Sequence, residues 1–356
     1  MAVGEVVVKA AGSIKSGKVF TLQVKMANPE GDPVWPGRQG ATRINVMDAG
    51  HYHAGKGPQF AGGAEYADDY MTLFLQGSTQ YDALGHVWYD GQIWNGYDSK
   101  TTIGGLSKAS ILPIAEKGVV GRGVLLDMAR FRGKECLDVA ETFTHEDLLA
   151  CAKKQGCEIQ KRDILIVRTG WIAKFYKVSR EEFYGNFVEP GLTHSDALVN
   201  WFADMEIPNL VTDTIANEVT VDPVSGVVLP LHNALMRNLG VTLTEIAWLD
   251  DLAADCAKDG QYTFPVSLNG ADNQVSSIDF RVQFDPSVFQ PVNAAAGNSA
   301  HKPRSSSADI KPDATTALPN CSAESATTET GSKERNRGST HHKRGAGNSK
   351  SSGGKN

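Results

Sequence analysis

Apolar residues fall into short runs that are separated by Gly, Pro and Asp, and this pattern continues to about residue 267. Short apolar runs bounded by such residues are typical of strands. We therefore expect strands at Val19–Val24, Met71–Leu75, Gly123–Leu126, Ile164–Val167 and Leu210–Thr212.

Helices are predicted between several of these strands. Thr144 and Asp147 have the spacing of a capping box, and the apolar positions that follow them end at Gly156. Thr193 and Asp196 have the same capping-box spacing and precede a second apolar run. Strands and helices that alternate in this way predict an α/β layered fold.

The end of the chain differs in composition from the rest. Residues 294–356 are rich in Ser, Ala, Gly, Asn, Lys and Thr, with one leucine, one isoleucine and no aromatic residue. Such a segment cannot bury enough apolar surface to offset its ordering entropy, so we predict a disordered tail. The chain then divides into a folded domain (1–267), a divergent segment of uncertain structure (268–293) and the tail.

Charge and cysteine content narrow the class of protein. The tail holds 10 Lys+Arg against 5 Asp+Glu, which leaves 25 against 36 in the rest of the chain. An acidic body argues against nucleic-acid binding. The sequence shows neither a secretory signal nor an apolar run of about 18 residues, and its five cysteines lack C-x-x-C spacing. We predict a cytoplasmic protein that binds neither nucleic acid nor membrane.

Polar residues with catalytic chemistry follow the apolar run Met71–Leu75. Asp82 and His86 are four residues apart, so one helical turn would place a carboxylate and an imidazole on one face. There they could share a metal ion or act as an acid–base pair. Gln76 and Gln80 have the same spacing. A capping pair on the surface is the alternative interpretation for Asp82 and His86.

A second polar segment begins at His232. It is predicted as a short helix that ends at Gly240, followed by a strand that contains Glu245. A position in the first helical turn favours a neutral, metal-binding imidazole, although a packed or capping histidine is the alternative. Asp82, His232 and Glu245 could together hold a divalent ion and leave a position for water, provided that the fold brings them together.

Other candidate features carry less chemistry. Aromatic residues near the first polar segment, among them Trp88 and Tyr97, could line a substrate pocket or belong to the core. The glycine-rich run Gly118–Gly123 precedes a predicted strand, whereas a nucleotide-binding fingerprint follows one. We therefore predict no nucleotide site.

Six separated motifs resemble, in order, those of the cyclase family that includes bacterial kynurenine formamidase and isatin hydrolase. The motifs are STQYDALGHVWYDGQIWNGY (78–97), GRGVLLDMARFRG (121–133), RDILIVRTGW (162–171), EPGLT (189–193), DTIANE (213–218) and LPLHNALMRNLGVTLTEI (229–246). The resemblance covers about residues 30–265. It implies a swivelling β/β/α cyclase-like fold in a single catalytic domain, homodimers or homotetramers, and metal-dependent hydrolysis of an amide, formamide or lactam bond. An arylformamidase of tryptophan catabolism is the best-known example.

The resemblance also implies roles for individual residues. Asp82, His232 and Glu245 match metal ligands and His86 matches the residue that assists proton transfer, while Gln80 and Gln76 stand where the family has histidines. Amide oxygen is a weaker zinc ligand than imidazole, so the cofactor is expected to be Zn²⁺ or the harder Mn²⁺. The residues expected to bind substrate are Tyr81, Trp88 and Tyr97.

Two features of the chain keep a second class of function open. The glutamines weaken the expected metal site, and the sequence after Tyr262-Thr263-Phe264 does not match the family's usual ending. A non-catalytic small-molecule-binding protein with a degenerate metal site is the alternative. Ring closure, which the family name suggests, is a third possibility.

Overall fold

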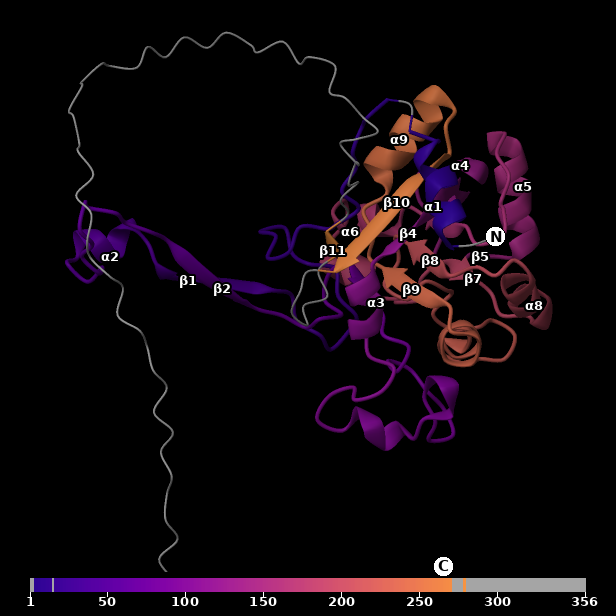
Figure 1. The fold of residues 1–356 in the computed structure, drawn as a ribbon. Coiled ribbons are helices and arrows are strands. Elements are labelled where there is room, and N and C mark those ends of the chain that lie inside the picture. The colour runs from indigo at the N-terminus through magenta and orange to yellow at the C-terminus, as the bar shows by residue number, and fades with distance from the viewer. Residues whose placement is uncertain (1–2, 15, 271–277, 280–356) are drawn as a thin grey trace, which may run out of the picture. The chain divides into compact units, whose positions relative to one another are not determined.

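A seven-stranded mixed sheet forms the centre of the fold (Figure 1). The computed structural model describes residues 3–14, 16–270 and 278–279, which lie in one compact unit. The strand order is β11-β10-β4-β6-β8-β9-β3, in which β4, β6, β8 and β9 are parallel and the outer strands antiparallel. The strands are β3 (Gln80–Tyr81), β4 (Val119–Asp127), β6 (Ile164–Arg168), β8 (Asn209–Thr212), β9 (Thr242–Glu245), β10 (Thr263–Gly270) and β11 (Ile278–Asp279).

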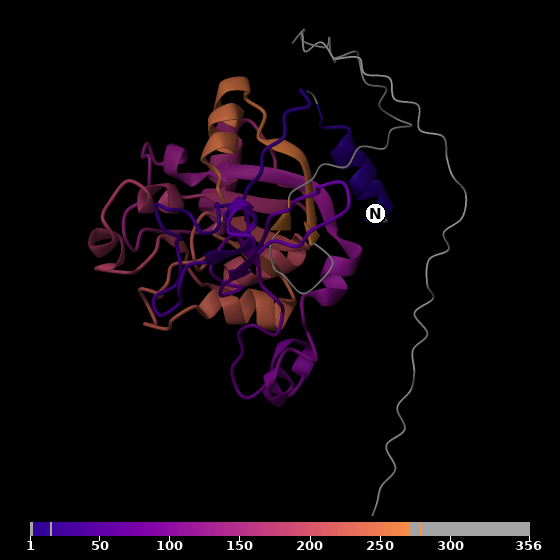
Figure 2. The same cartoon turned by 90° about the vertical axis from the view of Figure 1, so that its left-hand side faces the viewer.

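Both faces of the parallel strands are buried. Leu165 and Val167 of β6 pack into one apolar core, and Ile164 and Ile166 pack into another on the opposite face. This explains why these strands appear in the sequence as continuous apolar runs, which is typical of parallel sheets covered on both sides. Helices α5 (His145–Gln155), α8 (Asp196–Asp204) and η3 (His232–Leu239) contribute to the first core and α9 (Asp250–Asp259) to the second (Figure 2).

The helices vary in length, and several consist of little more than one turn. They are α1 (Val3–Ala11), α2 (Ala49–His53), α3 (Leu112–Lys117), α4 (Met128–Phe131), α5 (His145–Gln155), α6 (Trp171–Phe175), α7 (Arg180–Tyr184), α8 (Asp196–Asp204) and α9 (Asp250–Asp259), with the 3₁₀ turns η1 (Trp94–Gly96) and η2 (Ser99–Thr102) and the π-helix η3 (His232–Leu239). None of them, within the residues described, is long and apolar enough to cross a membrane.

Two smaller sheets accompany the main one. Strand β1 (Thr42–Met47) pairs with β2 (Asp68–Thr72), and β5 (Thr142–Phe143) pairs with β7 (Gly191–Leu192). The expected strand at Met71–Leu75 is therefore shifted, because β2 ends at Thr72.

Most of the predicted elements are confirmed, with two corrections besides β2. The predicted strands at 123–126, 164–167 and 210–212 lie within β4, β6 and β8, and the capping box of Thr144 and Asp147 starts α5. The strand expected at Val19–Val24 is wrong, since this extended segment makes an isolated bridge at Gln23 instead. Helix α8 is capped by Ser195 rather than Thr193, whose hydroxyl bonds to Asp222.

The predicted domain boundary at residue 267 falls inside β10. This strand pairs with β4 from Thr263 to Leu268 and continues to Gly270, where it pairs with β11. The predicted tail over 294–356 and most of the segment 268–293 lie outside the described residues.

Candidate metal centre

The main sheet brings Asp82, His232 and Glu245 together. Strand β3 runs antiparallel to β9 with Gln80 opposite Glu245, and the Asp82 backbone N–H donates to Leu243 O at 2.8 Å. Asp82 therefore lies just beyond β3, beside Leu243 of β9, and on the face of the sheet that carries Glu245. Helix η3 immediately precedes β9 and begins at His232. Two segments separated by about 150 residues thus meet at the carboxyl end of a parallel strand.

The three side chains form a compact, buried cluster. His232 Nε2 lies 3.2 Å from Glu245 Oε1 and 3.9 Å from Asp82 Oδ2. One ligating atom from each residue lies within 4.8 Å of the other two. Asp82 is only 1% exposed, which rules out the alternative of a capping pair on the surface.

The donor set fits a divalent cation. Among the described residues, both carboxylate oxygens of Asp82 and Gln80 Oε1 are buried without a hydrogen-bond partner, and Glu245 Oε1 lies 3.2 Å from His232 Nε2. Buried oxygens without partners are costly, and they are expected where an ion completes the site. Metal–oxygen and metal–nitrogen bonds of about 2.0–2.2 Å would place ligand atoms up to roughly 4.4 Å apart, close to the observed separation.

Glu218 orients the imidazole of His232. Its Oε1 accepts from His232 Nδ1 and from the His232 backbone N–H, each at 2.7 Å, and its Oε2 accepts from the Leu231 N–H at 2.6 Å. These bonds leave Nε2 facing the carboxylates. The motif resemblance gives Glu218 no role, and its only signal in the sequence is an acidic residue between the apolar residues Ala216 and Val219.

The charges of the cluster are strongly coupled. Burial, reinforced by the charge of Glu245, raises the pKa of Asp82 to about 6. Burial opposes charging of His232, but hydrogen bonds and charge from Glu218 and Glu245 outweigh it and raise the pKa of His232 to about 10. In the absence of a metal, these two carboxylates thus oppose the neutral form of His232 that the helix terminus favours.

The two glutamines occupy different positions. Gln80 is buried in the cluster, where its Nε2 donates to Glu245 Oε2 at 2.6 Å and its Oε1 is left without a partner among the described residues. Gln76 is half-buried, and its backbone carbonyl accepts from Arg38 Nη1 at 3.0 Å. Gln80 is thus placed to offer an oxygen to the site, while Gln76 contacts Arg38 through its backbone.

His86 lies at the edge of the cluster. The helical turn predicted between Asp82 and His86 is absent; instead, β3 is followed by a turn in which the His86 N–H donates to Ala83 O at 2.8 Å. His86 is half-buried. Burial lowers its pKa, and the negative charge of Asp82 only partly opposes this effect. The imidazole is therefore neutral at pH 7 and able to accept a proton.

The three aromatic residues expected to bind substrate lie in different environments. Tyr81 is buried in the core covered by α9, and its hydroxyl bonds to Thr242. Because side chains alternate along a strand, Tyr81 points away from the face that carries Gln80. Trp88 is 41% exposed, and Tyr97 is half-buried with the Lys108 ammonium over its ring. The structure does not bring Tyr81 to the cluster.

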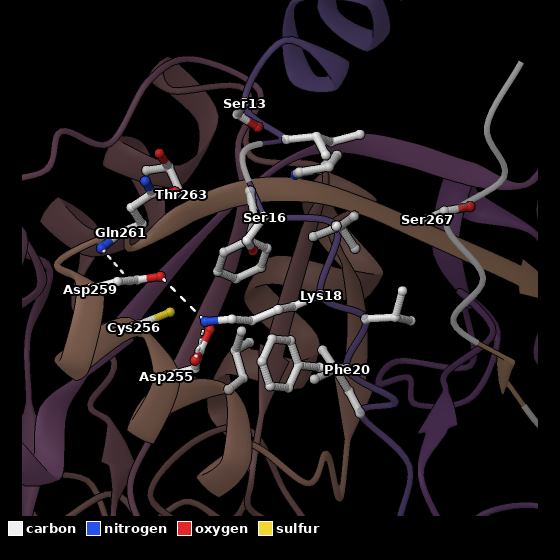
Figure 3. A pocket seen from close by; sticks show the side chains of 18 residues that line it. Ser13, Ser16, Lys18, Phe20, Asp255, Cys256, Asp259, Gln261, Thr263 and Ser267 are labelled. Atoms are coloured by element: carbon white, nitrogen blue, oxygen red, sulfur yellow. Dashed lines mark hydrogen bonds and ion pairs between the residues drawn. The ribbon is translucent and has the colours of Figure 1, made fainter. Parts of the chain in front are cut away.

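A cavity of about 110 Å³ lies elsewhere, between the residues around 13–22, α9 and β10 (Figure 3). Lys18 Nζ lies at its polar side, 2.6 Å from Asp255 and 3.9 Å from Asp259. These charges neutralise one another in part, and none of the metal-centre residues lines the cavity. We therefore place the chemistry at the buried cluster and not in this cavity.

Comparison with known proteins identifies the family. The family described as "Putative cyclase" matches residues 21–219, more than half of the chain. A crystal structure of a novel cyclase shares 33% sequence identity, with a TM-score of 0.70 over 78% of this chain and 92% of that chain. The chain therefore belongs to this cyclase family and has its α/β fold.

More distant structures were also found. Isatin hydrolase A from Labrenzia aggregata shares 18% identity (TM-score 0.47; 70% of this chain, 87% of that chain). A predicted metal-dependent hydrolase from Bacillus stearothermophilus shares 16% (TM-score 0.38; 66% and 84%). No curated protein matches. The description "Cohesin domain" matches residues 253–332, a minor part of the chain that begins within α9 and lies mostly outside the described residues.

Proposed function

We propose that the chain is a metal-dependent hydrolase of an amide, formamide or lactam bond. The observation that carries this proposal is the buried cluster of Asp82, His232 and Glu245, whose ligating atoms lie within 4.8 Å of one another in a cyclase-family fold. A site with three protein ligands retains a coordination position for water or substrate, which distinguishes catalytic from structural metal sites.

Asp82, His232 and Glu245 would hold the ion, and an octahedral ion such as Mn²⁺ would also take the amide oxygen of Gln80 and still leave positions for water. Carboxylate and amide oxygens suit Mn²⁺, and the imidazole suits Zn²⁺ equally well. When bound, such an ion makes water more acidic and polarises a carbonyl group. Glu218 would keep the His232 ring in its ligating orientation through the bond at Nδ1.

His86 would move the proton of the reaction. Its lowered pKa keeps the imidazole neutral, so it can take a proton from the attacking water as the C–O bond forms. It would then return this proton to the leaving nitrogen as the C–N bond breaks. The products are a carboxylic acid and an amine, joined in one molecule when the substrate is a lactam.

Arylformamidase-like specificity and a place in tryptophan catabolism remain predictions of the motif resemblance.

Assembly into a homodimer or homotetramer is likewise a proposal. The β1–β2 sheet exposes Ile44, Val46 and Tyr70, which are 40–49% exposed, and a two-stranded sheet is marginally stable alone in water. A second copy of the chain in a homodimer or homotetramer would cover these side chains, which light scattering can measure.

Turnover tests the proposed reaction. Metal-loaded protein would be assayed with formanilide and isatin, alongside His86→Ala and a control, His194→Ala, which alters an exposed histidine at the start of α8. The proposal predicts hydrolysis by the unaltered protein and the control, and a loss of about 10²-fold or more in kcat for His86→Ala. Metal retention without hydrolysis of any amide or lactam would favour the small-molecule-binding alternative.

A further inference from the structure

Arg38 lies against the polar segment that leads into the metal centre. Its Nη1 donates to Gln76 O at 3.0 Å. A Cβ atom placed on Gly77 would lie 3.5 Å from the carbonyl oxygen of Gln39, so the two backbones approach closely here. Arg38 is therefore fixed beside a segment that reaches Gln80 and Asp82 within a few residues.

The loop that carries Arg38 is held at several points. The Asp32 carboxylate accepts the backbone N–H groups of Ala27, Asn28 and Ala41 at 3.1, 3.0 and 2.7 Å. Further along, the Tyr184 hydroxyl donates to Val34 O at 2.9 Å. A loop anchored in this way keeps the arginine in place without a ligand, which reduces the entropy lost on binding.

The charge of Arg38 reaches the reacting groups. Burial is the main influence on both pKa values, since it raises the pKa of Asp82 and lowers that of His86. The positive charge of Arg38 lowers both pKa values, so it opposes the rise at Asp82 and adds to the fall at His86. The remaining charged side chains around His232 are carboxylates, namely Asp82, Glu218 and Glu245. Arg38 thus supplies positive charge within electrostatic reach of an acidic cluster.

One edge of the guanidinium is available. Nη1 bonds to Gln76, while Nε and Nη2 make no hydrogen bond or ion pair within the described part of the chain, and the side chain is half-buried. The Nε–Nη2 edge is a planar fork of two N–H donors that matches the two oxygens of a carboxylate. Water can hydrate this edge of the guanidinium. Because the loop holds Arg38 in place near the cluster, the same edge is also suited to binding a carboxylate.

We propose that Arg38 binds a carboxylate carried by the substrate, so that the substrates are amides, formamides or lactams bearing a negatively charged carboxylate away from the bond that breaks. This inference rests on the proposed hydrolase function. Binding at Arg38 would keep the substrate's negative charge away from Asp82 and Glu245 and leave its amide carbonyl directed toward the metal centre.

The test compares two substrates that differ by one carboxylate, 2-formamidobenzoate and formanilide, using metal-loaded protein. The variants are Arg38→Gln and Arg38→Lys, with Arg132→Gln as a matched control because Arg132 pairs with Asp147 on α5. We expect Arg38→Gln to lower the kcat/KM ratio of acid to neutral substrate by about 10- to 100-fold, mainly through KM. Arg38→Lys should recover part of this loss, and the control should leave the ratio unchanged.

An unchanged ratio in Arg38→Gln would overturn the inference, including the case in which both substrates slow equally. If the unaltered protein hydrolyses neither these substrates nor isatin, the hydrolase proposal fails, but Arg38 can still be tested by calorimetry with benzoate and benzamide. Benzoate binding that weakens in Arg38→Gln, with benzamide unaffected, would support the carboxylate site. Equal benzoate affinity in both proteins would overturn it.

Discussion

His232 Nδ1 lies 2.7 Å from Glu218 Oε1, and the same oxygen accepts the backbone N–H of His232 at 2.7 Å. One carboxylate therefore fixes both the start of helix η3 and the orientation of the ring. Both groups are almost fully buried, so neither bond can be replaced readily by water. This arrangement makes the metal-binding geometry depend on a residue that need not touch the metal.

Glu218→Gln should lower metal affinity by about 10- to 100-fold, since an amide presents one acceptor and one donor where three N–H groups now converge. Competition with a chromophoric chelator measures the effect. Glu146→Gln, on the exposed start of α5, serves as the control. Equal affinities for Glu218→Gln and the unaltered protein would show that Glu218 does not orient the ligand.

Metal binding should release protons in a pH-dependent manner. His232, with a pKa of about 10, must lose the proton at Nε2 to bind a metal, so about one proton is released at pH 8. Below the Asp82 pKa of about 6, that carboxyl is also protonated, and release rises toward about two. Affinity therefore falls as pH falls, and more steeply below pH 6. Binding enthalpies in buffers of different ionisation enthalpy count the protons; no release at pH 8 would contradict the predicted charge state.

Gly191→Ala should destabilise the protein and weaken the metal site together. A Cβ at this position would overlap the backbone of Glu218 and lie 2.5 Å from Val219 N, so the backbone that carries Glu218 must move. We expect a loss of more than about 2 kcal/mol in the free energy of unfolding, measured in urea. Gly226→Ala, where φ is +70° and nothing lies within 4 Å of the added Cβ, should cost only about 1 kcal/mol of backbone strain. Similar losses in both variants would refute the packing argument.

The sequence predicted the sheet better than the surrounding segments. Strands β4, β6 and β8 are long apolar runs whose two faces are both buried, so their signal is strong. Val19–Val24 has a similar pattern but makes only an isolated bridge at Gln23. Local patterns do not show whether a neighbouring strand edge is available, and this decides whether an extended segment becomes a strand.

The candidate ligands were predicted from motifs, whereas their environment was not. The motif resemblance alone predicts that Asp82, His232 and Glu245 belong to one site. The roles of Glu218 and Arg38 depend on contacts across 14 and 38 residues, which no local spacing reveals. The raised pKa of His232 has the same origin, since it depends on two carboxylates from different segments.

The most direct test of the metal centre is elemental analysis of protein purified without added metal or chelator. It would be applied to the unaltered chain, to Asp82→Ala, and to Asp98→Ala, which removes an exposed carboxylate outside the cluster. We predict about one Mn or Zn per chain in the unaltered protein and in Asp98→Ala, and a loss of this metal in Asp82→Ala. Metal that is retained in Asp82→Ala, or absent from all three proteins even after incubation with Mn²⁺ and Zn²⁺, would contradict the assignment of Asp82, His232 and Glu245 as a metal centre.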